Sequence, residues 1–255
     1  MNLGIIGCGA IGTDVAKAAD MMKEIKKIYL YDINKKASKE LCNSLKKAEV
    51  SEVKKFLGDV DVVFEGASQQ AVIEYAFQII NAGKDLIIMS VGSLFDDDFR
   101  KKLEKIARKK NRKIYIPSGA VCGIDGILSA NVGGLNEVTL VTTKPPSSLG
   151  KKFTTRSIVF NGNARDAVNK FPSNINVAAS LSLAGVGFDK TEVKIVADPV
   201  VTRISHKILA HGKFGRLRAE VENMPNPNNP KSSYMASLSA IATLKRIINP
   251  IQIGA

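Results

Sequence analysis

The stretch of sequence that decides the fold is LGIIGCGAIG, from Leu3 to Gly12. An apolar run typical of a buried strand leads directly into the pattern G-x-G-x-x-G, and a helical pattern of apolar residues follows it. Gly7 would permit a tight turn, Gly9 would let backbone amides approach a pyrophosphate, and Gly12 would let the helix pack close to the sheet. The stretch therefore predicts the phosphate-binding turn of a dinucleotide-binding domain.

An acidic residue at a suitable distance strengthens this interpretation. Asp32 lies 20 residues after Gly12 (32 − 12), at the end of a second apolar run at residues 28–31. A carboxylate there can accept hydrogen bonds from ribose hydroxyls, and it repels a 2′-phosphate, so it favours NAD over NADP. Lys35 and Lys36 follow closely and would tolerate that phosphate, so NADP stays open as a second cofactor. A glycine turn in some other α/β domain is the alternative explanation.

Apolar strands and amphipathic helices alternate through the first half of the chain. We expect strands at residues 3–6, 28–31, 61–64, 86–89 and 114–116. The expected helices between them span residues 11–22, 37–47, 69–81 and 97–110. Short apolar strands separated by helices are typical of a parallel sheet that is covered on both faces. With right-handed crossovers, this pattern predicts an α/β fold with a Rossmann doubly wound parallel sheet, whose ligand lies at the carboxyl ends of the strands.

Small residues follow three successive strands of this predicted sheet. Ala67 and Ser68 come after the third strand. Ser90 and Val91 follow the fourth strand, and Ala120 follows the fifth. Small side chains would let a flat dinucleotide lie against the backbone; a short turn explains any one strand end, but three successive ends favour a crevice. The predicted cofactor contacts of this half are Gly7, Gly9, Ala10, Ile11, Gly12, Asp32, Ala67, Ser68, Ser90, Val91 and Ala120.

The pattern changes after about residue 120, where strand-like segments become more frequent. They lie at residues 138–143, 157–160, 193–197, 203–209 and 217–222, with one apolar helix at 175–186. This predicts a second, mostly antiparallel α+β domain. Residues 225–230 read as a stiff, turn-rich connection, and a final helix at 234–248 is expected to pack back on the first domain. The predicted domains are therefore residues 1–118 plus 231–255, which bind the dinucleotide, and residues 119–230, which carry catalysis and dimerisation.

The charge of the chain invites a nucleic-acid interpretation that other features weaken. The formal net charge is +13, from 37 Lys and Arg against 24 Asp and Glu, and such a charge can attract nucleic acid or acidic substrates. The basic residues lie mostly on the polar sides of helical patterns, as in residues 97–113, which favours solvated helix faces. Aromatic residues make up only 6% of the chain, so no platform for stacking single strands is visible. We therefore predict no nucleic-acid partner.

Other features bear on the compartment. No apolar run approaches the length of a membrane span, and the first strand begins at once, with no signal peptide before it. The three cysteines, Cys8, Cys42 and Cys122, lie far apart and form neither a metal-binding nor a disulfide pattern. These features predict a cytoplasmic protein that has no metal site and no membrane partner.

Only two histidines, His206 and His211, could supply an imidazole base. A nicotinamide enzyme that oxidises an amine or an alcohol needs a proton acceptor near the carbon that loses hydride, and imidazole suits that role near neutral pH. The two positions differ by an odd number, so in one strand they face opposite sides, and we expect at most one of them to face the cleft. A histidine on the surface, or one that is simply hydrogen-bonded, is the alternative for each.

Polar and cationic residues of the second half could bind the rest of a substrate or the nicotinamide amide. The candidates for a substrate carboxylate are Lys144, Lys213, Ser232 and Ser233. Among so many lysines, solvated side chains are the alternative explanation. Asn174 and Asn176 precede the apolar helix, where one could be a helix cap or the pair could bond the nicotinamide amide.

Taken together, the motifs of the chain resemble those of the L-aspartate dehydrogenase family over essentially the whole length. The glycine turn is shared by many dehydrogenases, but the whole set in this order is specific. The segments that carry the resemblance are residues 7–12, 65–69 (EGASQ), 117–126 (PSGAVCGIDG), 144–146 (KPP), 171–179 (FPSNINVAA), 197–206 and 229–233 (NPKSS).

The resemblance implies a two-domain homodimer that uses NAD or NADP. It implies oxidative deamination of L-aspartate, through iminoaspartate, to oxaloacetate and ammonia, and it suggests that iminoaspartate feeds NAD biosynthesis. The family's catalytic histidine follows its Asp-Pro segment and corresponds to His206, whereas His211 has no such support. The family's residues near the nicotinamide correspond to Asn176 and Ala120. The family usually has Asn two residues before the histidine, where this chain has Ile204.

Two other functions remain open on the sequence. One is a related Rossmann dehydrogenase or reductase that acts on another amino or imino acid, for instance an enzyme like homoserine dehydrogenase or dihydrodipicolinate reductase. The other is a non-catalytic NAD-sensing protein whose positive charge binds nucleic acid. The lack of a helix-turn-helix pattern and the presence of a full second domain weigh against this second alternative.

Overall fold

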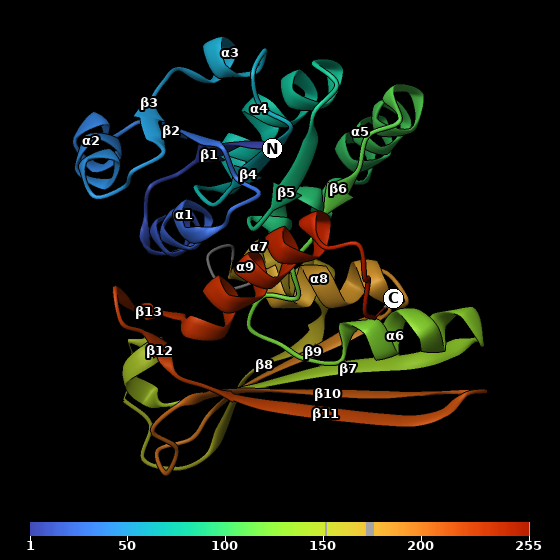
Figure 1. Cartoon of the computed structure of the whole chain (residues 1–255). Coiled ribbons are helices and arrows are strands. Elements are labelled where there is room, and N and C mark those ends of the chain that lie inside the picture. The colour runs from blue at the N-terminus through green and yellow to red at the C-terminus, as the bar shows by residue number, and fades with distance from the viewer. Residues whose placement is uncertain (151, 172–175, 255) are drawn as a thin grey trace. The chain divides into compact units, whose positions relative to one another are not determined.

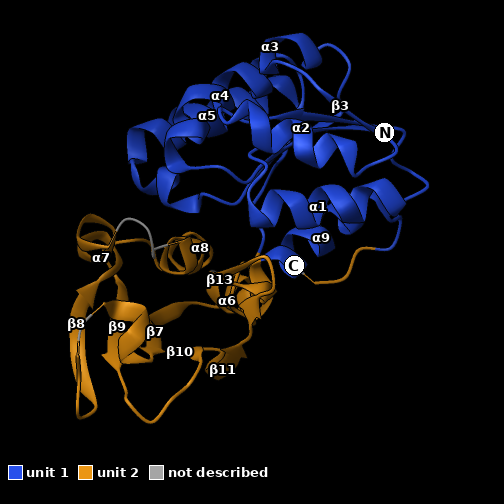
Figure 2. Ribbon diagram, turned by 90° about the vertical axis from the view of Figure 1, so that its left-hand side faces the viewer, with its two compact units in different colours: residues 1–117, 237–251 blue, residues 118–236, 252–255 orange. Residues whose placement is uncertain are grey.

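The computed structural model describes residues 1–150, 152–171 and 176–254. The chain divides into two compact units, which Figure 2 shows in different colours. Unit 1 comprises Met1–Pro117 and Ser237–Ile251, and unit 2 comprises Ser118–Ala236 and Gln252–Ala255. The sequence placed its functional domain boundaries after residue 118 and before residue 231, and those boundaries stay a prediction.

Unit 1 is built on a six-stranded sheet in which all neighbouring strands run parallel. Its strands are β1 (Asn2–Ile6), β2 (Lys27–Tyr31), β3 (Ala48–Val50), β4 (Val62–Glu65), β5 (Asp85–Ile88) and β6 (Ile114–Tyr115). Its helices are α1 (Ala10–Met21), α2 (Lys35–Asn43), α3 (Val53–Phe56), α4 (Gln69–Asn81), η1 (Val91–Phe95), α5 (Asp97–Lys110) and most of α9 (Tyr234–Ile248). The central strands are buried along almost their whole length, which is why their sequences are continuous apolar runs.

The strand order places the ends of β1 and β4 side by side. The order is β3-β2-β1-β4-β5-β6, so the winding of the chain reverses between β1 and β4. A doubly wound sheet binds its ligand at this reversal, outside the carboxyl ends of the strands. The two ends are joined directly, because the N–H of Gly66 donates to the carbonyl oxygen of Ile6 over 2.9 Å. The predicted Rossmann fold is confirmed, and the glycine turn follows β1, one of the two strands at this reversal.

Three short elements of unit 1 were not predicted: β3, α3 and η1. The strand β3 has three residues, none of them buried, and the helix α3 has a single turn. Neither sequence carries a periodic apolar pattern, and β3 is defined by its pairing with the edge of β2 rather than by its own composition. The helix at residues 234–248 has the predicted bounds, and its residues from Ser237 onward belong to unit 1, as expected.

Unit 2 is built on a five-stranded sheet. Its strands are β7 (Leu135–Lys144), β8 (Ser157–Asn163), β9 (Thr191–Ala197), β10 (Ile204–Gly212) and β11 (Gly215–Asn223), in the order β11-β10-β7-β9-β8. The neighbours are antiparallel except for the β7–β9 pair. Figure 1 shows the helices α6 (Ile124–Val132), α7 (Ala164–Lys170) and α8 (Asn176–Ala184) on one side of this sheet. The mostly antiparallel α+β architecture is therefore confirmed.

Unit 2 contains more helix than the sequence predicted. The sequence predicted one helix there, and the structure adds α6, α7 and the short turn η2 (Pro146–Leu149). The helix α6 has only nine residues and includes a glycine, which weakens its apolar periodicity. The expected turn-rich connection is a small hairpin, because β12 (Pro225–Asn226) pairs antiparallel with β13 (Asn229–Ser233).

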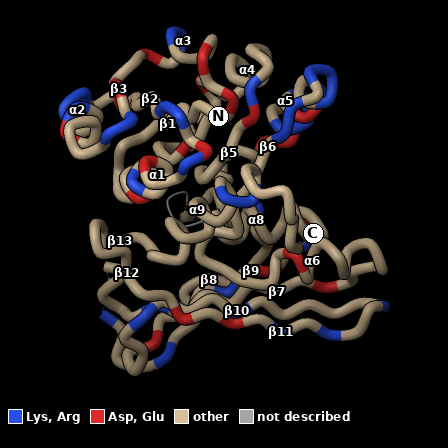
Figure 3. Tube along the Cα trace, viewed as in Figure 1, with Lys and Arg blue, Asp and Glu red and all other residues tan. Residues whose placement is uncertain are grey.

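The basic residues lie where the sequence analysis expected them. Figure 3 shows Lys and Arg along α2 and α5. On α5, every lysine is exposed, whereas Leu103 and Ala107 are buried. These charges therefore lie on a solvated helix face. Within the part of the chain that the structure describes, no helix is long and apolar enough to cross a membrane.

Candidate functional site

The three glycines of the turn after β1 are required for different reasons. Gly7 has a φ of +98°, and a Cβ there would lie 2.7 Å from the backbone nitrogen of Ala67. A Cβ on Gly12 would lie 1.9 Å from the carbonyl oxygen of Gly7, so only glycine lets α1 pack this close to the turn. A Cβ on Gly9 would meet no protein atom within 4 Å. The space beside Gly9 is what a pyrophosphate approaching the backbone requires.

The first turn of α1 offers its backbone N–H groups to an anion. Gly9 is the N-cap of α1, and no side chain caps the helix. In contrast, the N-caps of α2, α4 and α5 are Asn34, Ser68 and Asp96, whose side chains accept hydrogen bonds from backbone N–H groups of the first turn. Uncapped N–H groups and the helix dipole together favour a bound phosphate. The predicted contacts Ala10 and Ile11 are the first two residues of this helix.

Asp32 lies directly after β2, next to the glycine turn. Its Oδ2 accepts a hydrogen bond from the N–H of Cys8 over 2.7 Å, and its Oδ1 accepts one from the N–H of Asn34 over 2.7 Å. These bonds fix the carboxylate at the carboxyl edge of the sheet and leave lone pairs on both oxygens for ribose hydroxyls. The glycine turn, the uncapped helix and this carboxylate fit the adenosine and pyrophosphate parts of a dinucleotide.

A buried carboxylate that the sequence analysis did not single out connects the next two strand ends. Glu65 ends β4 with only 1% of its surface exposed, and it accepts hydrogen bonds from the backbone N–H groups of Ala67 and Ser68. It also accepts hydrogen bonds from the backbone and the side chain of Ser90. Val91 begins η1 and is buried. An acid that ends an apolar strand and is followed by small residues was the available signal.

Ala120 and Asn176, the other predicted cofactor contacts, belong to unit 2. Ala120 is buried, and its carbonyl oxygen accepts a hydrogen bond from the side chain of Asn223 over 3.0 Å. Asn223 is itself buried at the end of β11, and the hydroxyl of Ser233 donates to its Oδ1. Asn176 is the first residue of α8, and Asn174 lies outside the described residues.

His206 lies on the buried face of the unit 2 sheet. Burial alternates along β10, so His206 is 9% exposed whereas His211 lies on the opposite, exposed face, as the odd spacing predicted. Strand register places His206 opposite Thr142 of β7, and the Thr142 hydroxyl lies 2.9 Å from Nδ1 of the imidazole. This contact occupies one ring nitrogen and leaves Nε2 for proton exchange. Thr142 was not predicted, because cross-strand register is not visible in the sequence.

Lys144 lies two residues after Thr142 on β7, so both side chains project from the same face of the sheet as His206. Burial, and secondarily the charge of Lys144, lower the pKa of His206 from 6.5 to about 4. Lys144 is only 7% exposed, and burial lowers its pKa as well. With this lowered pKa, the His206 imidazole is neutral near pH 7 and has one unprotonated ring nitrogen.

Lys144→Met should raise the pKa of His206 from about 4, but not to 6.5, because burial is the larger cause and remains. The measurement is an NMR titration of the imidazole signals, which is simple because the chain has only two histidines. His211→Ala assigns the signals. Lys207→Met is the matched control, because Lys207 follows His206 on β10, projects from the opposite face of the sheet and pairs with Glu220. An unchanged His206 titration in Lys144→Met would contradict this electrostatic coupling.

The other residues that were predicted to bind a substrate carboxylate do not lie beside His206 in this way. Lys213 is exposed in the turn between β10 and β11. The hydroxyl of Ser232 donates to the carbonyl oxygen of Asn229 over 3.0 Å, and that of Ser233 donates to Asn223. The structure therefore groups Lys144 with His206 and Thr142, and it places Ser233 in the bonding network of Ala120.

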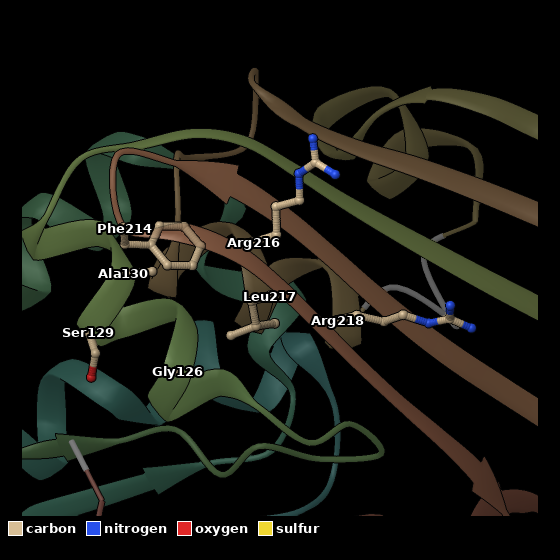
Figure 4. Close-up of a pocket in the computed structure, with 7 residues that line it drawn as sticks. All are labelled: Gly126, Ser129, Ala130, Phe214, Arg216, Leu217 and Arg218. Carbon is tan, nitrogen blue, oxygen red and sulfur yellow. The ribbon is translucent and has the colours of Figure 1, made fainter.

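A separate depression of about 510 Å³ lies between α6 and β11, and Figure 4 shows the residues that line it. Its lining includes Ser129, Phe214 and Arg216 and none of the predicted site residues. No group of three or more His, Cys, Asp or Glu within the described ranges could hold a metal ion. The chemistry-bearing residues are thus those of the glycine turn, the strand ends of unit 1 and the β7–β10 pair of unit 2.

Both units match profiles of known protein families. Residues 7–117 match the profile described as homoserine dehydrogenase, NAD binding domain. Residues 125–247 match the profile described as aspartate dehydrogenase, C-terminal. The first match ends at residue 117, where the first segment of unit 1 ends, whereas the second match also includes residues 237–247 of unit 1.

Individual proteins match over the whole chain. The L-aspartate dehydrogenase of Methanosarcina acetivorans is 43% identical over an alignment of 269 residues that covers 100% of this chain and 99% of that protein. The L-aspartate dehydrogenase of Methanothermobacter thermautotrophicus is 40% identical, with 100% and 98% coverage. A crystal structure of aspartate dehydrogenase from Thermotoga maritima matches with a TM-score of 0.85 and 31% identity, covering 100% of this chain and 99% of that one.

Proposed function

Because the chain belongs to the L-aspartate dehydrogenase family, we propose that this oxidoreductase converts L-aspartate and NAD, through iminoaspartate, to oxaloacetate, ammonia and NADH. The observation that carries the proposal is the state of His206. It is a buried imidazole with a lowered pKa, and Thr142 engages one of its ring nitrogens. A neutral base held in one orientation is what oxidation of an amine requires, since the amino group must lose its proton before hydride leaves the carbon.

The residues of the chain have distinct parts in this reaction. When bound, the nicotinamide ring accepts the hydride that leaves the α-carbon of aspartate. Nε2 of His206 would accept the proton of the substrate ammonium group and release it to solvent. After hydride transfer, the neutral imidazole would accept a proton from the water that adds to the iminium carbon, and would return that proton to the nitrogen that leaves as ammonia. Thr142 orients the ring through Nδ1. The positive charge of Lys144, on the same sheet face, would bind a substrate carboxylate.

We propose that the cofactor contacts are the residues of unit 1 that the sequence predicted for this role, together with Ala120 and Asn176. The adenosine ribose would bond to Asp32, and the pyrophosphate would lie over Gly9 and the first turn of α1. We propose NAD as the preferred cofactor, because the Asp32 carboxylate is held in place by two backbone N–H groups and would repel a 2′-phosphate. Lys35 and Lys36 are exposed at the start of α2, so weaker use of NADP is compatible with this proposal.

Asp32→Asn should lower kcat/KM for NAD and raise it for NADP. A hydrogen bond to a charged group contributes about 1.5–3 kcal/mol, which corresponds to roughly 10- to 100-fold in the NAD-to-NADP ratio. Initial rates with each cofactor measure the ratio. Glu104→Gln is the control, because it removes an exposed carboxylate of α5 that pairs with Arg100 and not with Lys35 or Lys36. A ratio that does not move in Asp32→Asn would remove Asp32 from the cofactor site.

We propose further that the enzyme is a homodimer of the cytoplasm. The helices cover one face of the unit 2 sheet, and its other face carries Leu209 and Ile158 with 38% and 67% of their surfaces exposed. A second copy could cover this face, and light scattering on the purified chain tests the dimer.

The three cysteines are free thiols, which suits a reducing compartment such as the cytoplasm. Iminoaspartate released before hydrolysis would supply NAD biosynthesis, as the family resemblance suggests.

A panel of amino acids tests the proposed activity. The purified protein is incubated with NAD and, in turn, L-aspartate, D-aspartate, L-glutamate, L-alanine and L-homoserine, and NADH formation is followed. Activity confined to L-aspartate is the expected result. Turnover of another acid alone would keep the dehydrogenase chemistry and replace the substrate, whereas NAD binding without any turnover would favour a non-catalytic sensor.

A further inference from the structure

Glu65 is an acidic residue buried in the core of unit 1, at the carboxyl end of β4. Its Oε1 accepts hydrogen bonds from the N–H groups of Ala67 and Ser68 over 2.8 and 2.9 Å. The same oxygen accepts the hydroxyl of Ser90 over 2.8 Å, and Oε2 accepts the N–H of Ser90 over 3.0 Å. All four partners are donors, so the side chain must act as an acceptor at both oxygens.

These four donors come from two separate segments of the chain. Ala67 and Ser68 belong to the turn between β4 and α4, and Ser68 is the N-cap of α4. Ser90 follows β5, the parallel neighbour of β4, and is the N-cap of η1. Glu65 thus joins two adjacent strand-end loops by hydrogen bonds. Burial raises the pKa of its carboxyl, while the hydrogen bonds from Ser90, Ala67 and Ser68 oppose that rise.

The two joined loops lie on the half of the sheet opposite to the adenosine site. A doubly wound sheet consists of two mononucleotide-binding halves that meet where the strand order reverses. The half that contains β1, β2 and β3 carries the glycine turn and Asp32, which fit the pyrophosphate and the adenosine ribose. The half that contains β4, β5 and β6 is left for the nicotinamide nucleoside, and its first two strand ends are the ones that Glu65 holds.

We propose that Glu65 is a positioning residue for the nicotinamide half of the dinucleotide site. It holds the Ala67–Ser68 turn and the Ser90–Val91 turn in fixed relation and acts through them rather than by touching the cofactor. This inference rests on the proposed function, because it takes the dinucleotide to bind across the strand ends of unit 1. It adds a residue whose role is to shape one half of that site.

Glu65→Gln tests the role with the smallest change of shape. An amide has one acceptor oxygen and one donor nitrogen, so it cannot accept hydrogen bonds at both positions. At least one donor, on Ala67, Ser68 or Ser90, would then face another donor in a buried place. The two loops should separate locally, whereas the glycine turn and Asp32 keep their own hydrogen bonds.

The effect of this change on the nicotinamide half of the site is measured by calorimetric binding of NAD and of ADP to the full chain. ADP lacks the nicotinamide nucleoside and therefore reports on the other half alone. Glu65→Gln should raise the Kd for NAD by at least about tenfold and leave the Kd for ADP unchanged. Ser90→Ala, which removes one of the four donors, should raise the Kd for NAD less. The double variant should bind NAD no more weakly than Glu65→Gln alone, because both changes act on one network. Glu104→Gln, an exposed carboxylate of α5, should alter neither Kd.

Two results would overturn the inference. One is equal weakening of NAD and ADP binding by Glu65→Gln, which would mean that Glu65 supports unit 1 as a whole. The other is unchanged NAD binding. If Glu65→Gln does not fold, Glu65→Asp takes its place, because the shorter side chain cannot reach the donors of both loops. An unchanged Kd for NAD in that variant would contradict the role. Failure of the wild-type chain to bind either ligand would count against the proposed function and therefore against this inference with it.

Discussion

His206→Ala should lower kcat with L-aspartate by about 10²- to 10⁴-fold, which is the usual contribution of a positioned general base. Binding of NAD should change little, because His206 is not among the proposed cofactor contacts and the glycine turn and Asp32 of unit 1 keep their own hydrogen bonds. The effect should appear in kcat rather than in the Kd for NAD. Steady-state rates together with calorimetric NAD binding check both parts of this result.

Two further variants separate the chemical role of His206 from its packing. His206→Asn keeps a polar group beside the Thr142 hydroxyl but cannot act as a base near neutral pH, so it should be as slow as His206→Ala. His211→Ala removes an exposed imidazole from the opposite face of the same strand, and it should be as active as the wild type. Near-normal turnover in a folded His206→Asn variant would show that another group is the base.

Gly9→Ala and Gly12→Ala should both abolish tight NAD binding, but for different physical reasons. In Gly12→Ala the new Cβ would lie 1.9 Å from the carbonyl oxygen of Gly7, so α1 must move away from the turn. Overpacking of this kind costs about 1–3 kcal/mol or more, and the melting temperature should fall with it. In Gly9→Ala no protein atom lies within 4 Å of the new Cβ, so the fold should be nearly unaffected.

The loss of binding in Gly9→Ala would come from the cofactor itself. The new methyl group would occupy the space that the pyrophosphate needs, and the Kd for NAD should rise by at least about tenfold. Gly58→Ala is the matched control, because its Cβ also meets nothing within 4 Å and it lies away from the turn. Thermal melts give the melting temperature of each of the three variants, and calorimetry gives its Kd for NAD. Unchanged NAD affinity in Gly9→Ala would place the pyrophosphate elsewhere.

The elements with local sequence signals were predicted well. The helices α4, α5 and α9 have the predicted bounds, and the first two begin after side-chain caps, at Ser68 and Asp96. The helix α5 ends where Asn111 adopts a left-handed conformation, which asparagine tolerates well. Such signals depend on a few neighbouring residues, so the sequence alone displays them. The opposite faces of His206 and His211 followed in the same way, from the two-residue period of a strand.

The interactions that depend on pairing between distant segments could not be predicted. Thr142 meets His206 because of the register between β7 and β10, and Glu65 meets Ser90 because β4 and β5 are neighbours. The strand β3 forms because its backbone pairs with the edge strand β2, and its own residues, none of them buried, give no strand pattern. Sequence patterns describe each segment by itself, whereas these contacts are set by which segments become neighbours in the folded chain.

The most direct test of the central claim is the fate of the α-hydrogen of L-aspartate. The enzyme is given NAD and L-aspartate that carries deuterium at the α-carbon, and the NADH formed is analysed by mass spectrometry and NMR. The account predicts that one deuterium appears at C4 of the nicotinamide ring of every NADH molecule. NADH without deuterium, or no NADH at all from an enzyme that binds NAD, would contradict direct hydride transfer from L-aspartate.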